Sequence, residues 1–155
     1  MPKTFSRILL LLLLVATTII PHTVATAHTT ATIATPTDSS TYRATYYDSQ
    51  NRIRLVINLY AETINVPGFS FIGPTHGYMS GNIYGIWIIT SCRIHSDGTA
   101  TLHLSNDQGA DSQTVRLTPQ PDNHMNYEAV NGNEIKRVQG RKLVKIPQKL
   151  NFVKQ

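Results

Sequence analysis

Several short stretches of this chain alternate between hydrophobic and polar residues. From Arg52 to Tyr60, every second residue is apolar and the intervening positions are mostly polar. That two-residue period predicts a half-buried β-strand. Tyr84 to Ile94 is more continuously apolar than any other run after residue 27, and its β-branched and aromatic residues favour a strand over a helix. We interpret Tyr84 to Ile94 as the central strand of the domain.

Further short extended stretches are separated by clusters of turn-forming residues. No amphipathic helix of three turns and no internal repeat is visible. The pattern predicts an all-β protein: a single small antiparallel β-barrel or sandwich of about eight or nine strands in a lipocalin-like meander. The remaining extended stretches, from which these strands are drawn, are Tyr42 to Tyr47, Phe69 to Ile72, Thr99 to Ser105, Ser112 to Thr118, His124 to Val130, Glu134 to Val138, Arg141 to Ile146 and Leu150 to Lys154. Asn131-Gly132-Asn133 predicts a hairpin into Glu134 to Val138.

Two registers compete at the turn after Ile94. A two-residue Asp-Gly loop would pair Cys92 with His103. A three-residue Ser-Asp-Gly loop, with Gly98 in the left-handed conformation, would pair Cys92 with Leu102 and Ile94 with Ala100. We prefer the second register because it aligns apolar residues with apolar residues.

The preferred register also assigns the two faces of the central strand. It pairs Thr90 with Leu104. It places four apolar side chains inward and leaves Trp87 and Ile89 on the opposite face. Unless another segment covers them, these two residues would form an exposed apolar patch of the kind that marks a binding surface. The four inward residues are Ile86, Ile88, Cys92 and Ile94.

Residues 1–27 have the features of a secretory signal peptide. Lys3 and Arg7 precede the apolar run Ile8–Ile20, and Ala25 and Ala27 form an A-x-A cleavage site. The alternative, an uncleaved anchor helix, is disfavoured because the apolar run is short. The Thr-rich, low-complexity residues 28–41 predict a flexible linker, followed by a β-domain at 42–155. We expect an exported protein, periplasmic or extracellular, with no membrane span after cleavage.

Charge is unevenly distributed along the predicted mature chain. Residues 28–134 contain five basic and nine acidic residues, whereas residues 135–155 contain seven basic residues and no acidic one. This basic end could bind an anionic polymer or a membrane surface. The alternative is that lysines on edge strands discourage edge-to-edge pairing. We expect no nucleic-acid partner, because a nucleic-acid footprint needs a broad basic face.

The residues that could carry chemistry do not form a known catalytic motif. Cys92 is the single cysteine, so no intramolecular disulfide is available, and its predicted inward position favours an inert, buried thiol. The histidines lack the spacing of a zinc site, and no phosphate-binding loop is present. We expect no metal and no cofactor. A hydrolase would require His95, Asp97 and His103 to converge in a cleft.

A better candidate site is the Gly-rich, aromatic stretch from Phe69 to Tyr84, in which Gly73 to Asn82 is predicted to be a long loop. Loops of this length inside compact domains are often functional, and aromatic side chains on a loop rim can stack on ligands. The alternative is that these aromatics pack into the core while the glycines permit turns. The candidate ligand-binding residues are Phe69, Phe71, His76, Tyr78, Tyr84 and Trp87.

Three stretches, Leu59 to Phe69, Ser105 to Asp111 and Gly132 to Phe152, resemble those of small exported bacterial β-sheet proteins. The resemblance implies export and a compact lipocalin-like β-fold, and it brings no catalytic residue. Gly85-Ile86-Trp87 has the spelling of the lipocalin Gly-x-Trp motif, although it lies in mid-domain rather than near the first strand.

Three functional hypotheses follow from these observations. The first is a non-enzymatic module that binds a small molecule, a glycan or a protein through the aromatic stretch. The second is a structural or assembly subunit that uses its edge strands, and the third is a hydrolase.

Overall fold

The computed structural model describes residues 40–108 and 110–155. The predicted signal peptide, residues 1–27, and residues 28–39 of the predicted linker lie outside the described residues. Within the described part of the chain, no helix has the length and hydropathy needed to cross a membrane.

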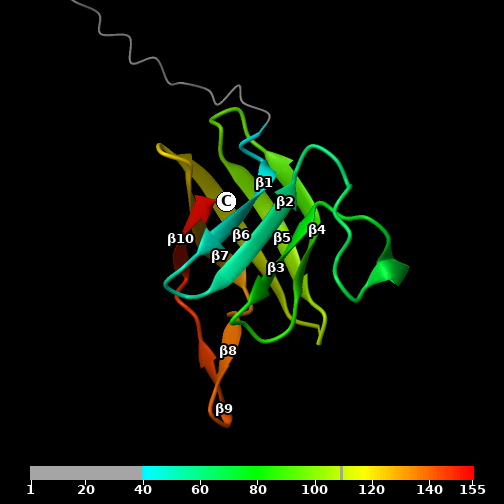
Figure 1. The fold of residues 1–155 in the computed structure, drawn as a ribbon, viewed down its shortest axis with the longest axis vertical. Coiled ribbons are helices and arrows are strands. Elements are labelled where there is room, and N and C mark those ends of the chain that lie inside the picture. Colours follow the sequence, from blue (N-terminus) through cyan, green and yellow to red (C-terminus); the bar gives the residue numbers. More distant parts are fainter. Residues whose placement is uncertain (1–39, 109) are drawn as a thin grey trace, which may run out of the picture. The chain divides into compact units, whose positions relative to one another are not determined.

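The described residues form a closed, eight-stranded antiparallel β-barrel, which confirms the predicted fold class (Figure 1). Each strand from β1 to β6 pairs with the next strand along the chain; β7 then pairs with β10, and β10 pairs with β1. The barrel strands are β1 (Arg43–Asp48), β2 (Ile53–Asn58), β3 (Gly77–Gly81), β4 (Trp87–Ile94), β5 (Ala100–Asn106), β6 (Ser112–Gln120), β7 (His124–Gly132) and β10 (Lys149–Lys154).

The interior of the barrel is filled with apolar side chains. The alternation predicted for β2 is confirmed, because Ile53, Leu55 and Ile57 are at most 1 % exposed, whereas Arg52 and Arg54 face solvent. The other strands contribute inward residues to the same cluster, including Met79, Leu102, Leu104, Val115, Leu117, Met125, Tyr127 and Phe152. The barrel is therefore not hollow, because apolar side chains occupy its centre.

The turn between β4 and β5 adopts the preferred register at its tip. Ile94 pairs with Ala100 and Cys92 pairs with Leu102, as predicted. Gly98 has a φ of 80°, which is the left-handed conformation that the three-residue loop requires.

The same register fails further along β4, where the prediction for Trp87 and Ile89 was wrong. A β-bulge between Ile89 and Ser91 inserts Thr90 as an extra residue, so Leu104 pairs with Ile89 and not with Thr90. One extra residue reverses the inward–outward alternation. Trp87 and Ile89 are therefore buried in the core at 2 % exposure each.

Two other predictions were wrong near β3. Phe69 to Ile72 was predicted as a strand, but Ser70–Ile72 forms a 3₁₀ helix. Gly73 to Asn82 was predicted as a loop, but it contains β3. Glycine content misled the prediction. Gly77 and Gly81 lie within β3, where an added Cβ would lie 2.1 Å from the Val56 carbonyl oxygen and 2.4 Å from the Arg52 carbonyl oxygen, respectively. Only glycine allows this approach.

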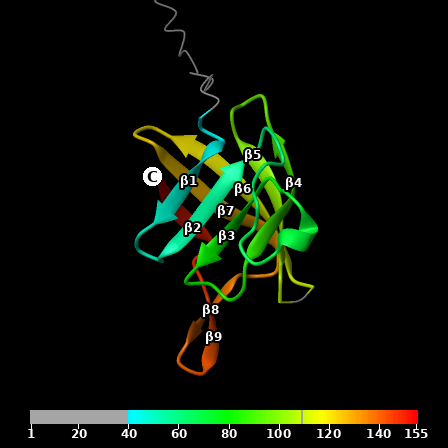
Figure 2. The ribbon, with the colours of Figure 1, turned by 45° about the vertical axis from the view of Figure 1, so that its right-hand side comes forward.

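Between β7 and β10 the chain forms a separate two-stranded sheet, composed of β8 (Lys136–Gln139) and β9 (Lys142–Lys145). The predicted hairpin at Asn131-Gly132-Asn133 is wrong, because β8 pairs with β9 rather than with β7. The Ser112 carbonyl accepts the Asn133 N–H at 2.6 Å, so this segment stays beside β6. Figure 2 shows the β8–β9 hairpin extending beyond the barrel wall.

Candidate functional site

A long connection between β2 and β3, residues 59–76, stands on the outside of the barrel beside β4 (Figures 1 and 2). We call it the excursion loop. Residues Ile64 and Thr75 form an isolated antiparallel bridge with hydrogen bonds of 3.0 and 2.9 Å, which ties the two arms of the loop together. Adjacent antiparallel strands can be joined by two residues, so a connection of this length is more than the barrel needs.

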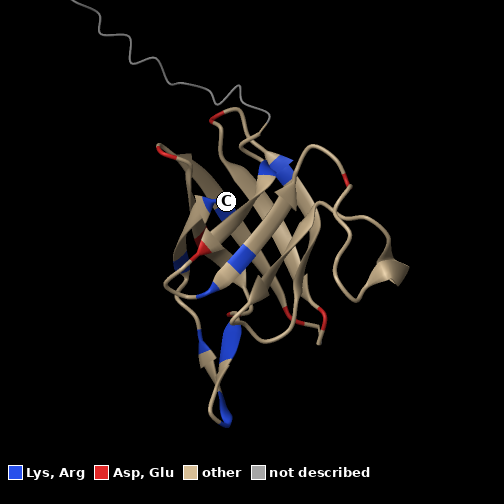
Figure 3. Ribbon diagram, viewed as in Figure 1, with Lys and Arg blue, Asp and Glu red and all other residues tan. Residues whose placement is uncertain are grey.

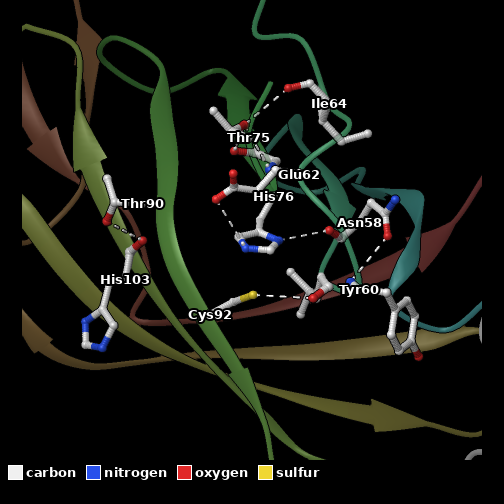
Figure 4. Close-up of polar contacts among 11 residues, drawn as sticks. Asn58, Tyr60, Glu62, Ile64, Thr75, His76, Thr90, Cys92 and His103 are labelled. Carbon is white, nitrogen blue, oxygen red and sulfur yellow. Dashed lines mark hydrogen bonds and ion pairs between the residues drawn. The ribbon is translucent and has the colours of Figure 1, made fainter. Parts of the chain in front are cut away.

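The base of the excursion loop is held by a polar network (Figure 4). The Asn58 N–H donates to the His76 carbonyl at 2.8 Å, and His76 Nδ1 donates to the Asn58 carbonyl at 3.2 Å. Asn58 Nδ2 donates to Thr63 Oγ1 at 2.7 Å. On the other side of the ring, His76 Nε2 lies 3.6 Å from Glu62 Oε1. The two side chains form an ion pair when both ring nitrogens carry a proton. This arrangement makes His76 a fixed support for the loop.

The tip of the excursion loop presents aromatic side chains. The rings of Phe69 and Phe71 pack with their centroids 5.9 Å apart and their planes at 49°. Phe71 is 81 % exposed, and the neighbouring Ile72 is 38 % exposed. A phenylalanine this exposed gains little from the hydrophobic effect in the free protein.

A groove of about 430 Å³ lies next to the tip. The excursion loop contributes Glu62, Ile72, Pro74 and Thr75 to its lining, and the barrel contributes residues that include Ile88 and Thr90 from β4. The bulge in β4 matters here, because it turns Ile88 outward while Trp87 and Ile89 face the core. The groove therefore combines aliphatic side chains with hydroxyl groups and the Glu62 carboxylate.

The structure brings together only part of the predicted ligand-binding set. Phe69 and Phe71 share the tip, and His76 lies at the base of the same loop. Tyr78 lines a different groove of about 450 Å³, with Pro67, Arg52 and Arg54 among the other lining residues.

The other two members of the predicted set lie elsewhere. Tyr84 is 43 % exposed, and its N–H donates to the Lys136 carbonyl at 2.7 Å. Trp87 belongs to the core, where its indole Nε1 has no hydrogen-bond partner among the described residues. Sequence reasoning missed Ile72, Pro74 and Ile88; the outward position of Ile88 depends on the bulge, which left no signal in the sequence.

Cys92 has the surroundings of an unreactive thiol. Its Sγ donates to the Leu59 carbonyl at 3.6 Å. Burial, and secondarily the Glu62 carboxylate, raise the pKa of the Cys92 thiol. A nucleophilic cysteine needs the opposite shift, toward the thiolate.

The three residues named for a hydrolase each bond to a threonine. His95 Nε2 lies 2.8 Å from Thr101 Oγ1, and His103 Nδ1 lies 3.1 Å from Thr114 Oγ1. The Asp97 carboxylate accepts the N–H and the hydroxyl of Thr99, which lowers its pKa. In the described residues, no group of three or more His, Cys, Asp or Glu side chains is arranged to hold a metal ion.

A second opening lies at the seam where β10 closes the barrel against β1. The two strands pair at Tyr46 with Lys154 and at Tyr47 with Val153, and β1 then ends in the turn that follows Asp48. A cleft of about 720 Å³ separates this turn from the first half of β10.

Hydrogen bonding shows which backbone groups of β10 face this cleft. The Gln148 carbonyl accepts from β7, and Lys154 N–H donates to the Asn123 carbonyl. Because bonded pairs alternate along an antiparallel ladder, Leu150 and Phe152 also bond to β7. The N–H and carbonyl groups of Lys149 and Asn151 therefore point toward the cleft.

Comparisons with protein-family models, curated proteins and solved structures found no match.

Proposed function

We propose that this protein is a non-enzymatic binding module that engages a partner protein through the tip of its excursion loop. The observation that carries the proposal is the exposed Phe71, packed against Phe69 and next to the groove in sequence through Ile72. Exposed aromatic residues beside a pocket are typical of the residues that dominate binding energy in protein interfaces. The fixed loop base favours binding as well, since a preordered loop loses little conformational freedom on association.

The proposal includes export of the chain and removal of residues 1–27. Residues 69–74 carry no charged side chain, and Glu62 is the one charged residue among those that line the groove. An apolar segment of another protein therefore suits this surface better than an anionic ligand. Mass spectrometry of the protein recovered outside the cytoplasm should give a mature N-terminus at His28.

Site-specific photo-crosslinking tests the binding surface. Phe71 is replaced by the photo-crosslinker p-benzoylphenylalanine in cells that export the protein, and Val130 is replaced in a matched control. Val130 is also an exposed apolar residue, at 54 %, but it lies on β7. Position 71 should yield a discrete adduct with one protein, and position 130 should not. The same bands from both positions, or no adduct at position 71, would refute the proposal.

Alanine substitution then measures the contribution of the tip. Burying a phenylalanine side chain stabilises a complex by about 1.5–3 kcal/mol, so Phe71→Ala should weaken binding of the crosslinked partner at least about tenfold. Val130→Ala should leave the affinity unchanged. Equal affinities for the two variants would show that the tip is not the contact.

A second candidate function, assembly through an exposed strand edge, is favoured by the seam. Lys149 and Asn151 present backbone hydrogen-bonding groups to an open cleft, and an extended segment could add to this edge. Light scattering should then show concentration-dependent oligomers. Asn151→Pro removes one donor that faces the cleft and should abolish them, whereas a mass that stays monomeric at all concentrations would exclude this function.

A further inference from the structure

The β8–β9 hairpin is an insertion that the barrel wall does not use. The wall is continuous from β7 to β10, and β8 and β9 pair with each other. The base of the hairpin is anchored in the core through Ile135 and Ile146, which are 2 % and 8 % exposed, and the Ile146 N–H donates to the Ile135 carbonyl at 3.0 Å. The hairpin is therefore held firmly at its base while its tip extends beyond the barrel.

The hairpin is strongly cationic. Residues 136–145 contain five basic residues and no acidic one. Lys145 pairs with Glu134. Lys136, Arg141 and Lys142 are exposed, and none of them forms an ion pair with another described residue. Figure 3 shows Lys and Arg gathered along this hairpin.

Two aliphatic side chains lie close to the same tip. Val138 pairs directly with Leu143, so both side chains lie on the same face of the hairpin. Val138 is 57 % exposed and Leu143 is 49 % exposed. Arg141 lies in the turn between the two strands, and Lys142 is the first residue of β9. An exposed apolar pair surrounded by cations combines the two interactions that attract a peptide segment to an anionic bilayer.

We propose that the β8–β9 hairpin docks on a lipid bilayer that carries anionic headgroups. The cations contact the headgroups, and the Val138–Leu143 pair enters the boundary between headgroups and acyl chains. A nucleic acid or an anionic polysaccharide fits this surface less well, because a polyanion offers the exposed Val138–Leu143 pair no apolar environment to enter. This docking site is separate from the excursion loop and does not depend on the function proposed for that loop.

Vesicle co-sedimentation of the mature protein tests the proposal. The protein should sediment with vesicles of phosphatidylcholine containing phosphatidylglycerol, and not with vesicles of phosphatidylcholine alone. Binding should weaken as the salt concentration rises, because salt screens exposed charges.

Three double variants separate charge from apolar contact. Each cation near an anionic surface contributes about a fivefold gain in partitioning, so Arg141→Ser with Lys142→Ser should lower it by about 25-fold. Val138→Ser with Leu143→Ser should also reduce binding and should remove what persists at high salt. Arg43→Ser with Arg116→Ser, which removes the same charge from exposed positions on the barrel, should have little effect. Fluorescence of the single, buried Trp87 verifies that each variant is folded.

Several outcomes would overturn the proposal. They are equal binding to neutral vesicles, equal losses for the barrel control and the hairpin variants, or no sedimentation with anionic vesicles. A serine variant at Val138 and Leu143 that binds as well as the parent would also overturn it. Duplex DNA or heparin that binds more tightly than the vesicles would assign the hairpin to an anionic polymer instead.

Discussion

Replacing Gly77 by alanine should destabilise the protein far more than an ordinary surface glycine substitution. Gly77 begins β3, immediately after the excursion loop, with a φ of 143° that L side chains rarely adopt. An added Cβ would lie 2.1 Å from the Val56 carbonyl oxygen and 3.0 Å from Ile57 Cα. Carbon–oxygen contacts between neighbouring strands are normally about 3.3 Å or longer, so β3 would have to move away from β2.

The expected magnitude has two parts. The backbone conformation costs about 1–3 kcal/mol for a residue other than glycine, and overpacking costs a further 1–3 kcal/mol or so. Gly77→Ala should therefore lower the free energy of unfolding by about 2–6 kcal/mol, a large share of the stability of a small domain. Gly68 is the matched control: its φ is 81°, but an added Cβ meets nothing within 4 Å. Gly68→Ala should cost about 1–2 kcal/mol.

Urea denaturation followed by the fluorescence of Trp87 measures both variants. The indole is buried in the folded protein and becomes exposed on unfolding, so one signal reports the global transition. The difference between the two variants isolates the contact between β3 and β2. If Gly77→Ala and Gly68→Ala differed by less than about 0.5 kcal/mol, the close approach of the two strands, and with it the fixed loop base, would be refuted.

Three further predictions concern buried or hydrogen-bonded polar groups. Cys92 should react with iodoacetamide more slowly in the folded protein than in the chain unfolded by urea, because burial raises the pKa of its thiol; equal rates by mass spectrometry would contradict this. Tyr127→Phe should cost about 1–3 kcal/mol in the same urea experiment, since the buried Tyr127 hydroxyl donates to Gln113 Oε1, and an unchanged midpoint would argue against that bond. Hydrogen bonds from Thr99 lower the pKa of Asp97, so this carboxylate stabilises the fold above its unfolded pKa of about 3.9, and the contribution disappears as the pH falls through the lower folded value. When the pH falls from neutral to below about 3, the Asp97→Asn variant should therefore lose less stability than the parent protein. Equal losses in the two proteins would show that Asp97 does not contribute.

The sequence determined the parts of the fold that depend on neighbouring residues. Alternation along β2 predicted its buried face, because side chains in a strand point to opposite sides at every step. The turn after Ile94 could be predicted for a similar reason, since Gly98 supplies the left-handed conformation and the apolar residues on both sides align in one register. The count of short strands and turns predicted a barrel or a sandwich.

The candidate site was predicted only in part, because its geometry depends on a single inserted residue. The aromatic tip was visible as Phe69 and Phe71, but the bulge at Thr90 decides that Ile88 faces the groove and that Trp87 faces the core. Nothing local identifies Thr90 as the extra residue. The bulge is favourable because it lets Trp87, Ile89 and Cys92 share the interior face of one strand.

Tertiary structure also decided closure of the barrel and separation of the β8–β9 hairpin. β10 pairs with β1 although nearly all of the domain's sequence lies between the two strands, and no local pattern encodes so distant a partner. Asn131-Gly132-Asn133 has strong hairpin propensity, yet the chain there remains paired with β6. The next strand, β8, then pairs with β9. Local propensity is worth about 1 kcal/mol, whereas burying Ile135, Ile146 and the β10 core residues contributes several times as much, so packing selected the pairing.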